Sequence, residues 1–71
     1  MMPLSLFPSG SKVNVAHVDG AEDTRAFLAS LGFTKGEPVK VVVKSGGNII
    51  VSIRETRVAL DEKLASRISC S

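Results

Sequence analysis

The chain has 71 residues, of which 44% are hydrophobic and 23% are charged, and its formal net charge is +2. This composition is too apolar for a disordered chain, and the length predicts one small domain, residues 1–71, with little material to enclose a deep active site. The single cysteine, Cys70, excludes an internal disulfide and a multi-cysteine metal site, so packing alone must hold the fold together.

No hydrophobic run approaches the roughly 20 residues that are needed to cross a bilayer. Residues 1–7 lack the basic start and the long apolar stretch of a signal peptide. We therefore expect a cytoplasmic protein without direct membrane insertion. A partner would have to recruit it to the inner face of a membrane.

The first strand is expected over residues 12–18, where Val13 and Val15 alternate with Lys12 and Asn14. Pro, Ser and Gly at positions 8–10 are typical of a turn before it.

The period then changes to three and four residues over residues 21–31, which predicts an inserted α-helix with one apolar stripe. The stripe consists of Thr24, Phe27, Leu28 and Leu31. We expect Asp19 to be the N-cap, and Gly32 to end the helix in the left-handed conformation.

Two hairpins are expected next. Residues 39–44 and 49–53 alternate as strands, with Ile49, Val51 and Ile53 on one face, and the glycines within residues 45–48 favour a tight turn between them. A turn or bulge at residues 55–56 then leads into a fourth strand over residues 56–60.

Asp61 is expected to cap a short helical turn over residues 61–65, with Leu64 pointing inward, before a closing strand over residues 67–70. The sequence thus predicts a mainly β fold of about five short strands, one inserted helix and one helical turn. Closing such strands into a small, partly open barrel protects their edges.

The side chains that could carry chemistry are few. His17 has no other ligand at metal-binding spacing, and Asp19, two residues away, offers at most a carboxylate–imidazole pair. Cys70 has no base near it in the sequence, so we expect a small residue of the closing strand rather than a nucleophile.

Other patterns have structural explanations as well. The Gly46-Gly47 pair is not followed by the Lys-Ser/Thr of a phosphate-binding loop or by a helix. Adjacent carboxylates occur where helices start, at residues 22–23 and 61–62, which suits the helix dipole. We expect no catalytic, cofactor-binding or metal site, and hence no enzyme.

By elimination, function is expected to lie in a surface. If Leu28 or Phe33 stays partly exposed near Arg25 and Lys35, the helix presents an apolar patch with a basic rim, which suits protein docking. The alternative is that these apolar residues all belong to the core.

Nucleic-acid binding is the second hypothesis, because basic residues outnumber acidic ones between positions 35 and 57. The candidate contacts are Lys40, Lys44, Arg54 and Arg57. The chain has no Trp or Tyr for base stacking, and charged residues on strands usually form a solvated face. We therefore expect no nucleic-acid partner.

The order of motifs resembles that of the FeoA family over almost the whole chain. Residues 31–36, Leu-Gly-Phe-Thr-Lys-Gly, are similar to the family's Leu-Gly-(Leu/Ile/Phe)-x-x-Gly, and residues 57–60 match its Arg-x-Ala-Leu. Leu4, Phe7 and Gly10 before the first strand, and the ending at residues 64–68, fit the same family.

This resemblance implies an SH3-like β-barrel with an inserted helix, in a cytoplasmic protein associated with FeoB, the ferrous iron permease that carries a G-domain. The family looks like a regulatory or assembly partner and carries no established catalytic residues. We therefore expect a non-enzymatic accessory protein of bacterial ferrous iron transport, monomeric or weakly homodimeric. A FeoA-like module with a different protein partner is the alternative within the family.

Two turns depart from the family pattern. Ser9-Gly10 replaces Pro-Gly, and Glu55-Thr56 stands where members often have Arg-Gly. Both lie outside the expected core, so they leave the fold prediction intact while the partner surface could differ.

Overall fold

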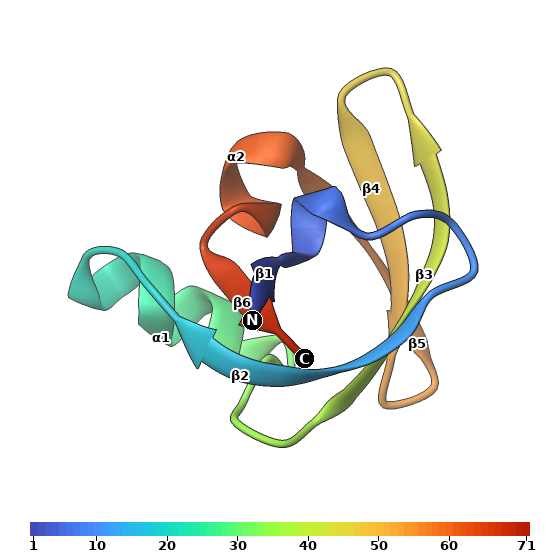
Figure 1. The fold of residues 1–71 in the computed structure, drawn as a ribbon. Coiled ribbons are helices and arrows are strands. Elements are labelled where there is room, and N and C mark those ends of the chain that lie inside the picture. Colours follow the sequence, from blue (N-terminus) through green and yellow to red (C-terminus); the bar gives the residue numbers. More distant parts are fainter.

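The computed structural model describes residues 1–71 and contains six strands, a short 3-10 helix and two α-helices (Figure 1). Along the chain they are β1 (Met2–Pro3), the 3-10 helix η1 (Leu4–Leu6), β2 (Lys12–Val18), α1 (Glu22–Ser30), β3 (Pro38–Ser45), β4 (Asn48–Ile53), β5 (Thr56–Asp61), α2 (Glu62–Ala65) and β6 (Ile68–Cys70). Neither α-helix has the length and apolar character needed to span a membrane.

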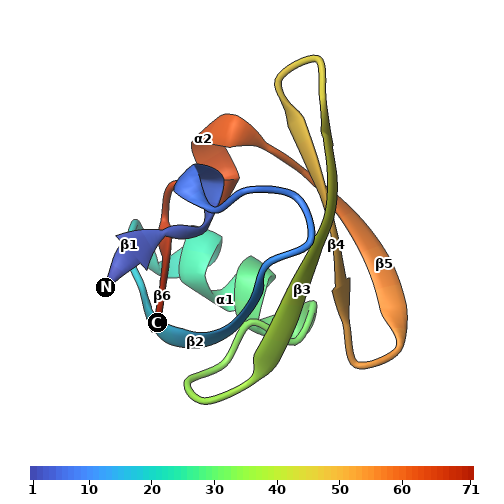
Figure 2. The same ribbon diagram turned by 45° about the vertical axis from the view of Figure 1, so that its right-hand side comes forward.

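The six strands form one antiparallel sheet in the order β1-β6-β2-β3-β4-β5, which curls around the core without closing, because β1 and β5 do not pair (Figure 2). The predicted mainly β, partly open barrel is confirmed. The sequence missed the sixth strand, β1, because two residues are too short to show a period.

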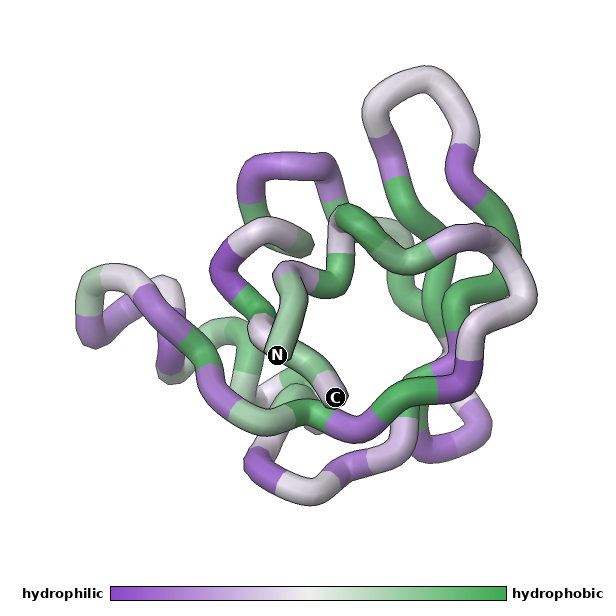
Figure 3. The backbone as a smooth tube through the Cα atoms, in the orientation of Figure 1, coloured by the Kyte–Doolittle hydropathy of each residue, from purple (hydrophilic) through white to green (hydrophobic).

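Alternation along the strands builds the core. Strand β2 switches between hydrophilic and hydrophobic residues at almost every step (Figure 3). Ile49, Val51 and Ile53 all face inward, as predicted, and each is at most 3% exposed. Fourteen buried hydrophobic residues form one cluster and no polar side chain is buried, so the core is held by apolar packing alone.

Strand β2 serves both halves of the sheet. Val13 pairs with Val39 of β3, whereas Val15 pairs with Cys70 of β6. A register shift between Val15 and His17 accompanies this change of partner. An irregularity of this kind bends a strand, and here it lets one strand take part in both halves of the barrel.

The predicted inserted helix is confirmed as α1, but its predicted N-cap is wrong. The helix begins at Glu22, and Ala21 is the N-cap, without a side-chain hydrogen bond. Asp19 lies two residues too early and accepts a hydrogen bond from His17 instead.

The predicted helix end is confirmed. Gly32 has φ = 111°, and two main-chain bonds close the helix, from Gly32 N to Ala29 O and from Phe33 N to Leu28 O. This is a Schellman motif, in which the residue after the glycine folds back onto the helix. It brings Phe33 into the core beside Leu28.

The end of the chain follows the prediction closely. The Asp61 carboxylate accepts a 2.7 Å hydrogen bond from Leu64 N and caps α2. Leu64 packs half-buried against the core, and Ala65 is the residue that α2 buries completely.

The turn between β4 and β5 differs from the expectation. Its two central residues are Arg54 and Glu55, with φ of 49° and 63°, while Thr56 already pairs with Ile53. Two residues with positive φ match the twist of a hairpin, but side chains other than glycine are strained there.

Candidate docking surface

Helix α1 is the element least integrated into the barrel, and it extends away from the sheet in Figure 1. Leu28 is its only buried residue. A nine-residue helix is marginal in isolation, because its hydrogen bonds barely offset the cost of nucleation. The contact through Leu28 and the Schellman motif therefore anchor it.

Of the two alternatives for Leu28 and Phe33, exposure in a docking patch is wrong and burial in the core is confirmed, because these side chains are 0% and 1% exposed. Neither can contact a partner directly. Phe27 is the exposed aromatic residue, with 51% of its surface accessible. Consecutive residues on a helix differ by about 100°, so Phe27 lies at the flank of the stripe that Leu28 centres.

The neighbours of Phe27 on the surface of α1 lie three and four positions away along the chain. Of these, Asp23 and Ser30 are exposed, whereas Thr24 and Leu31 are half-buried. We call Phe27, Asp23 and Ser30 the α1 surface. The predicted apolar stripe contained Phe27, but its pattern does not show which of its residues a narrow barrel leaves uncovered.

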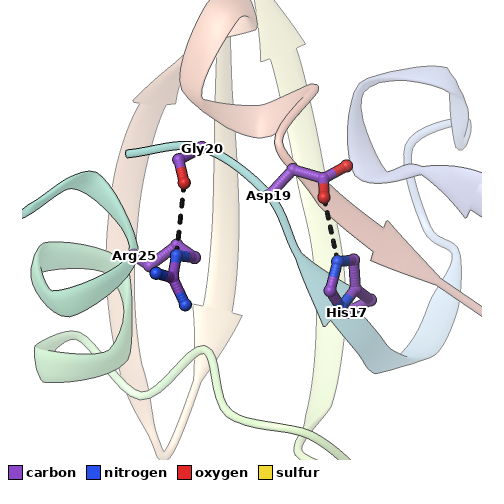
Figure 4. Close-up of polar contacts among 4 residues, drawn as sticks. All are labelled: His17, Asp19, Gly20 and Arg25. Atoms are coloured by element: carbon purple, nitrogen blue, oxygen red, sulfur yellow. Dashed lines mark hydrogen bonds and ion pairs between the residues drawn. The ribbon is translucent and has the colours of Figure 1, made fainter. Parts of the chain in front are cut away.

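The two predicted basic residues lie near this helix but do not form a closed rim around Phe27. Arg25 is exposed, and its Nε donates a 3.2 Å hydrogen bond to Gly20 O (Figure 4). Two positions separate Arg25 from Phe27, which puts the two side chains on different sides of α1. Lys35 is exposed in the loop after the helix.

His17 and Asp19 form the carboxylate–imidazole pair that the sequence allowed. Their Nε2 and Oδ1 atoms are 2.9 Å apart, and both side chains are 62% exposed (Figure 4). No three His, Cys, Asp or Glu side chains gather closely enough to hold a metal ion. The pair ties the end of β2 to the loop before α1.

Cys70 is fully buried in β6, between Met2 of β1 and Val15 of β2. Burial removes the solvation of the thiolate and raises the pKa of Cys70 to about 11. A thiol of this kind is protonated at neutral pH, which agrees with the predicted structural role.

The four cations considered for nucleic-acid binding do not form one patch. Lys44 Nζ donates to Ser5 O at 2.7 Å, and Arg54 Nε lies 3.3 Å from Glu37 Oε1. Lys40 and Arg57 remain, in a row across the outer face of the sheet. Direct register pairs define this row as Lys12, Lys40, Ser52 and Arg57.

Comparison with known proteins gives a consistent result. A family model described as the FeoA domain matches residues 2–71. A candidate Fe(2+) transport protein A of Methanocaldococcus jannaschii is 29% identical over 68 residues, which cover 96% of this chain and 83% of that protein.

Two solved structures with 34% identity have the same fold. One is a crystal structure of an iron uptake regulatory protein (FeoA), with a TM-score of 0.90 and coverage of 99% of this chain and 93% of that one. The other is FeoA of Stenotrophomonas maltophilia in complex with zinc, with a TM-score of 0.89 and coverage of 100% and 91%. The latter is described as a procaryotic SH3 domain protein, which agrees with the SH3-like barrel expected from the sequence.

Proposed function

The chain belongs to the FeoA family, and from this membership we propose that it is a non-enzymatic accessory protein of ferrous iron transport that acts by contact with a FeoB-type permease. It works at the cytoplasmic side of the membrane, where the permease recruits it. The names of its relatives support a role in iron transport. The half-exposed Phe27 on α1 supports action through a surface.

The α1 surface provides the apolar centre of this contact. Covering the exposed half of Phe27 would stabilise a complex by on the order of 1 kcal/mol. Asp23 and Ser30, one helical turn before and after Phe27, are exposed and give this apolar centre a polar edge.

The two basic residues predicted near the helix, Arg25 and Lys35, contribute to the contact through their charge. Arg25 and Lys35 are both exposed, so they can favour an acidic partner surface and speed the encounter. Leu28 and Phe33 contribute indirectly: they are buried in the core and hold α1 on the barrel.

Ferrous iron uptake in cells tests this function. A strain that lacks this protein is complemented with the wild type, with Phe27→Ala, or with Leu6→Ala. Leu6 is a matched control, because it is an apolar residue that is 63% exposed on η1 rather than on α1. We expect Phe27→Ala to reduce uptake towards the level of the deletion strain and Leu6→Ala to restore it.

Both variants should stay folded and lose a similar free energy of unfolding, about 1 kcal/mol, since each side chain is only partly buried. Normal uptake with Phe27→Ala at normal protein levels would exclude the α1 surface. Normal uptake in the deletion strain itself would exclude the transport function.

The row of Lys12, Lys40, Ser52 and Arg57 on the outer face of the sheet supports a second candidate function, binding of nucleic acid. Lys12 and Lys40 are direct neighbours across strands, and Arg57 lies in the same row. Phosphate contacts of this kind weaken steeply as salt concentration rises. Titration with single-stranded and double-stranded DNA and RNA at low salt distinguishes the two functions, because the transport proposal predicts no binding.

A further inference from the structure

Strand β5 is a free edge of the sheet. It is the last strand in the sheet order, and no other segment lies beside it on the side away from β4 (Figure 2). It pairs with β4 over all six of its residues without a register shift, and it contains no proline. An edge of this kind is a template for pairing with another strand.

The hairpin register shows which main-chain groups are free. Ile53 and Thr56 close the two-residue turn, so they exchange hydrogen bonds, and the pairs that do so alternate along the ladder. Arg57, Ala59 and Asp61 therefore direct their N–H and C=O groups away from β4. The bond from Glu62 N to Gly47 O, 3.0 Å long, continues the same alternation.

The side chains of these three residues are also exposed, on the face opposite the buried Leu60. They present a positive charge, a methyl group and a negative charge at equal spacing. One oxygen of Asp61 accepts from Leu64 N, and the other makes no hydrogen bond within the chain. Arg57 takes part in neither of the two ion pairs of the structure.

We propose that two copies of this chain pair antiparallel through β5, with the two-fold axis at Ala59. In this register Arg57 lies opposite the partner's Asp61, and Asp61 lies opposite the partner's Arg57. Ala59 faces its own counterpart, and its small side chain lets the two strands meet at the axis. The free N–H and C=O groups of all three residues then find partners across the interface.

Among the symmetric registers, only the axis at Ala59 pairs all three residues with one another, and charge disfavours two of the others. An axis at Arg57 or at Asp61 would bring like charges directly opposite each other, which destabilises strand pairs. The axis at Ala59 creates two opposite-charge pairs instead. It also joins the outer apolar rows of the two copies, each formed by Val43, Ile50 and Ala59 in direct register.

The interface is independent of the proposed function. Strand β5 and α1 lie on different sides of the barrel, so both α1 surfaces stay free in the dimer (Figures 1 and 2). A short edge-to-edge contact buries little surface, so the dimer is expected to form only at high protein concentration.

Sedimentation velocity over increasing protein concentration tests the dimer with charge-reversal variants. We expect the wild type to shift from monomer to dimer. Arg57→Asp and Asp61→Lys each place like charges opposite each other, so each variant alone stays monomeric. An equimolar mixture restores both opposite-charge pairs and forms a heterodimer.

Lys40→Asp is the matched control, because it reverses a charge on the same face but two strands from the edge, and it should dimerise like the wild type. A wild type that stays monomeric at its highest soluble concentration would overturn the proposal. Dimers of Arg57→Asp alone, or a mixture that stays monomeric, would do the same.

Asp61→Lys also removes the cap of α2, so a second variant and readout guard against misfolding. Ala59→Pro deletes an N–H that points away from β4, so the hairpin keeps its bonds while the dimer loses its central pair. Hydrogen exchange of the wild type should slow with concentration at Arg57, Ala59 and Asp61 but not at Val58 and Leu60. Exchange rates at those three amides that do not change with concentration would contradict the proposed pairing.

Discussion

At the scale of single residues, Cys70 shows how burial without a polar partner defines a structural role. The thiol is fully enclosed between two other strands, and its pKa of about 11 results from desolvation alone. The sequence indicated this role because no base stood near the cysteine. It could not show the depth of burial, which depends on Met2 and Val15 from distant parts of the chain.

The raised pKa predicts a loss of stability at alkaline pH. Below pH 9 the thiol is protonated in both the folded and the unfolded chain. Between pH 9 and 11 the unfolded chain loses this proton first, so the free energy of unfolding falls as the pH rises. Urea unfolding of the wild type and of Cys70→Ala measures this change on either side of pH 9.

The comparison isolates one group, since lysine titration is common to both proteins. We expect the free energy of unfolding to fall less for Cys70→Ala than for the wild type across this range. Equal losses in the two proteins would show that the thiol does not contribute.

At the scale of elements, the two strands of the β4–β5 hairpin lie where the sequence predicts them, but the turn between them has an unfavourable backbone conformation. Glu55 has φ = 63°, a conformation that costs a residue other than glycine roughly 1–2 kcal/mol. The family pattern places glycine near this turn, and this chain departs from it there. The one-residue difference between the expected and the observed turn arises because Thr56 begins β5.

Glu55→Gly should therefore stabilise the protein by about 1 kcal/mol, because glycine adopts positive φ without steric strain. Chemical denaturation measures the gain. Glu55→Ala is the control, since it removes the same charge but keeps the Cβ atom. If alanine stabilises as much as glycine, the gain comes from the charge and the strain argument is wrong.

Helix α1 shows the limit of pattern analysis at the same scale. The three- and four-residue period located the helix and its glycine end, because both are local properties. Which side of the stripe the barrel covers depends on strands that are distant in sequence. For that reason the pattern left open whether Leu28 and Phe33 are exposed or buried, and the structure buries both and exposes Phe27.

At the scale of the whole molecule, the alternation of four strands predicted the barrel. Each of these strands is long enough to show a two-residue period, and each has one face in a single core. Strand β1 and the free edge at β5 could not be predicted this way. They follow from which strands become neighbours, and periodicity within one strand carries no information about its neighbours.

The proposed contact between α1 and a FeoB-type permease is tested most directly by an NMR titration. Isotope-labelled protein is titrated with the purified cytosolic domain of the permease from the same organism, and Phe27→Ala serves as the matched control. We predict shifts on residues 22–35 in the wild type, and much weaker shifts in the variant. Shifts confined to β3, β4 and β5, or equal shifts in both proteins, would contradict this proposal.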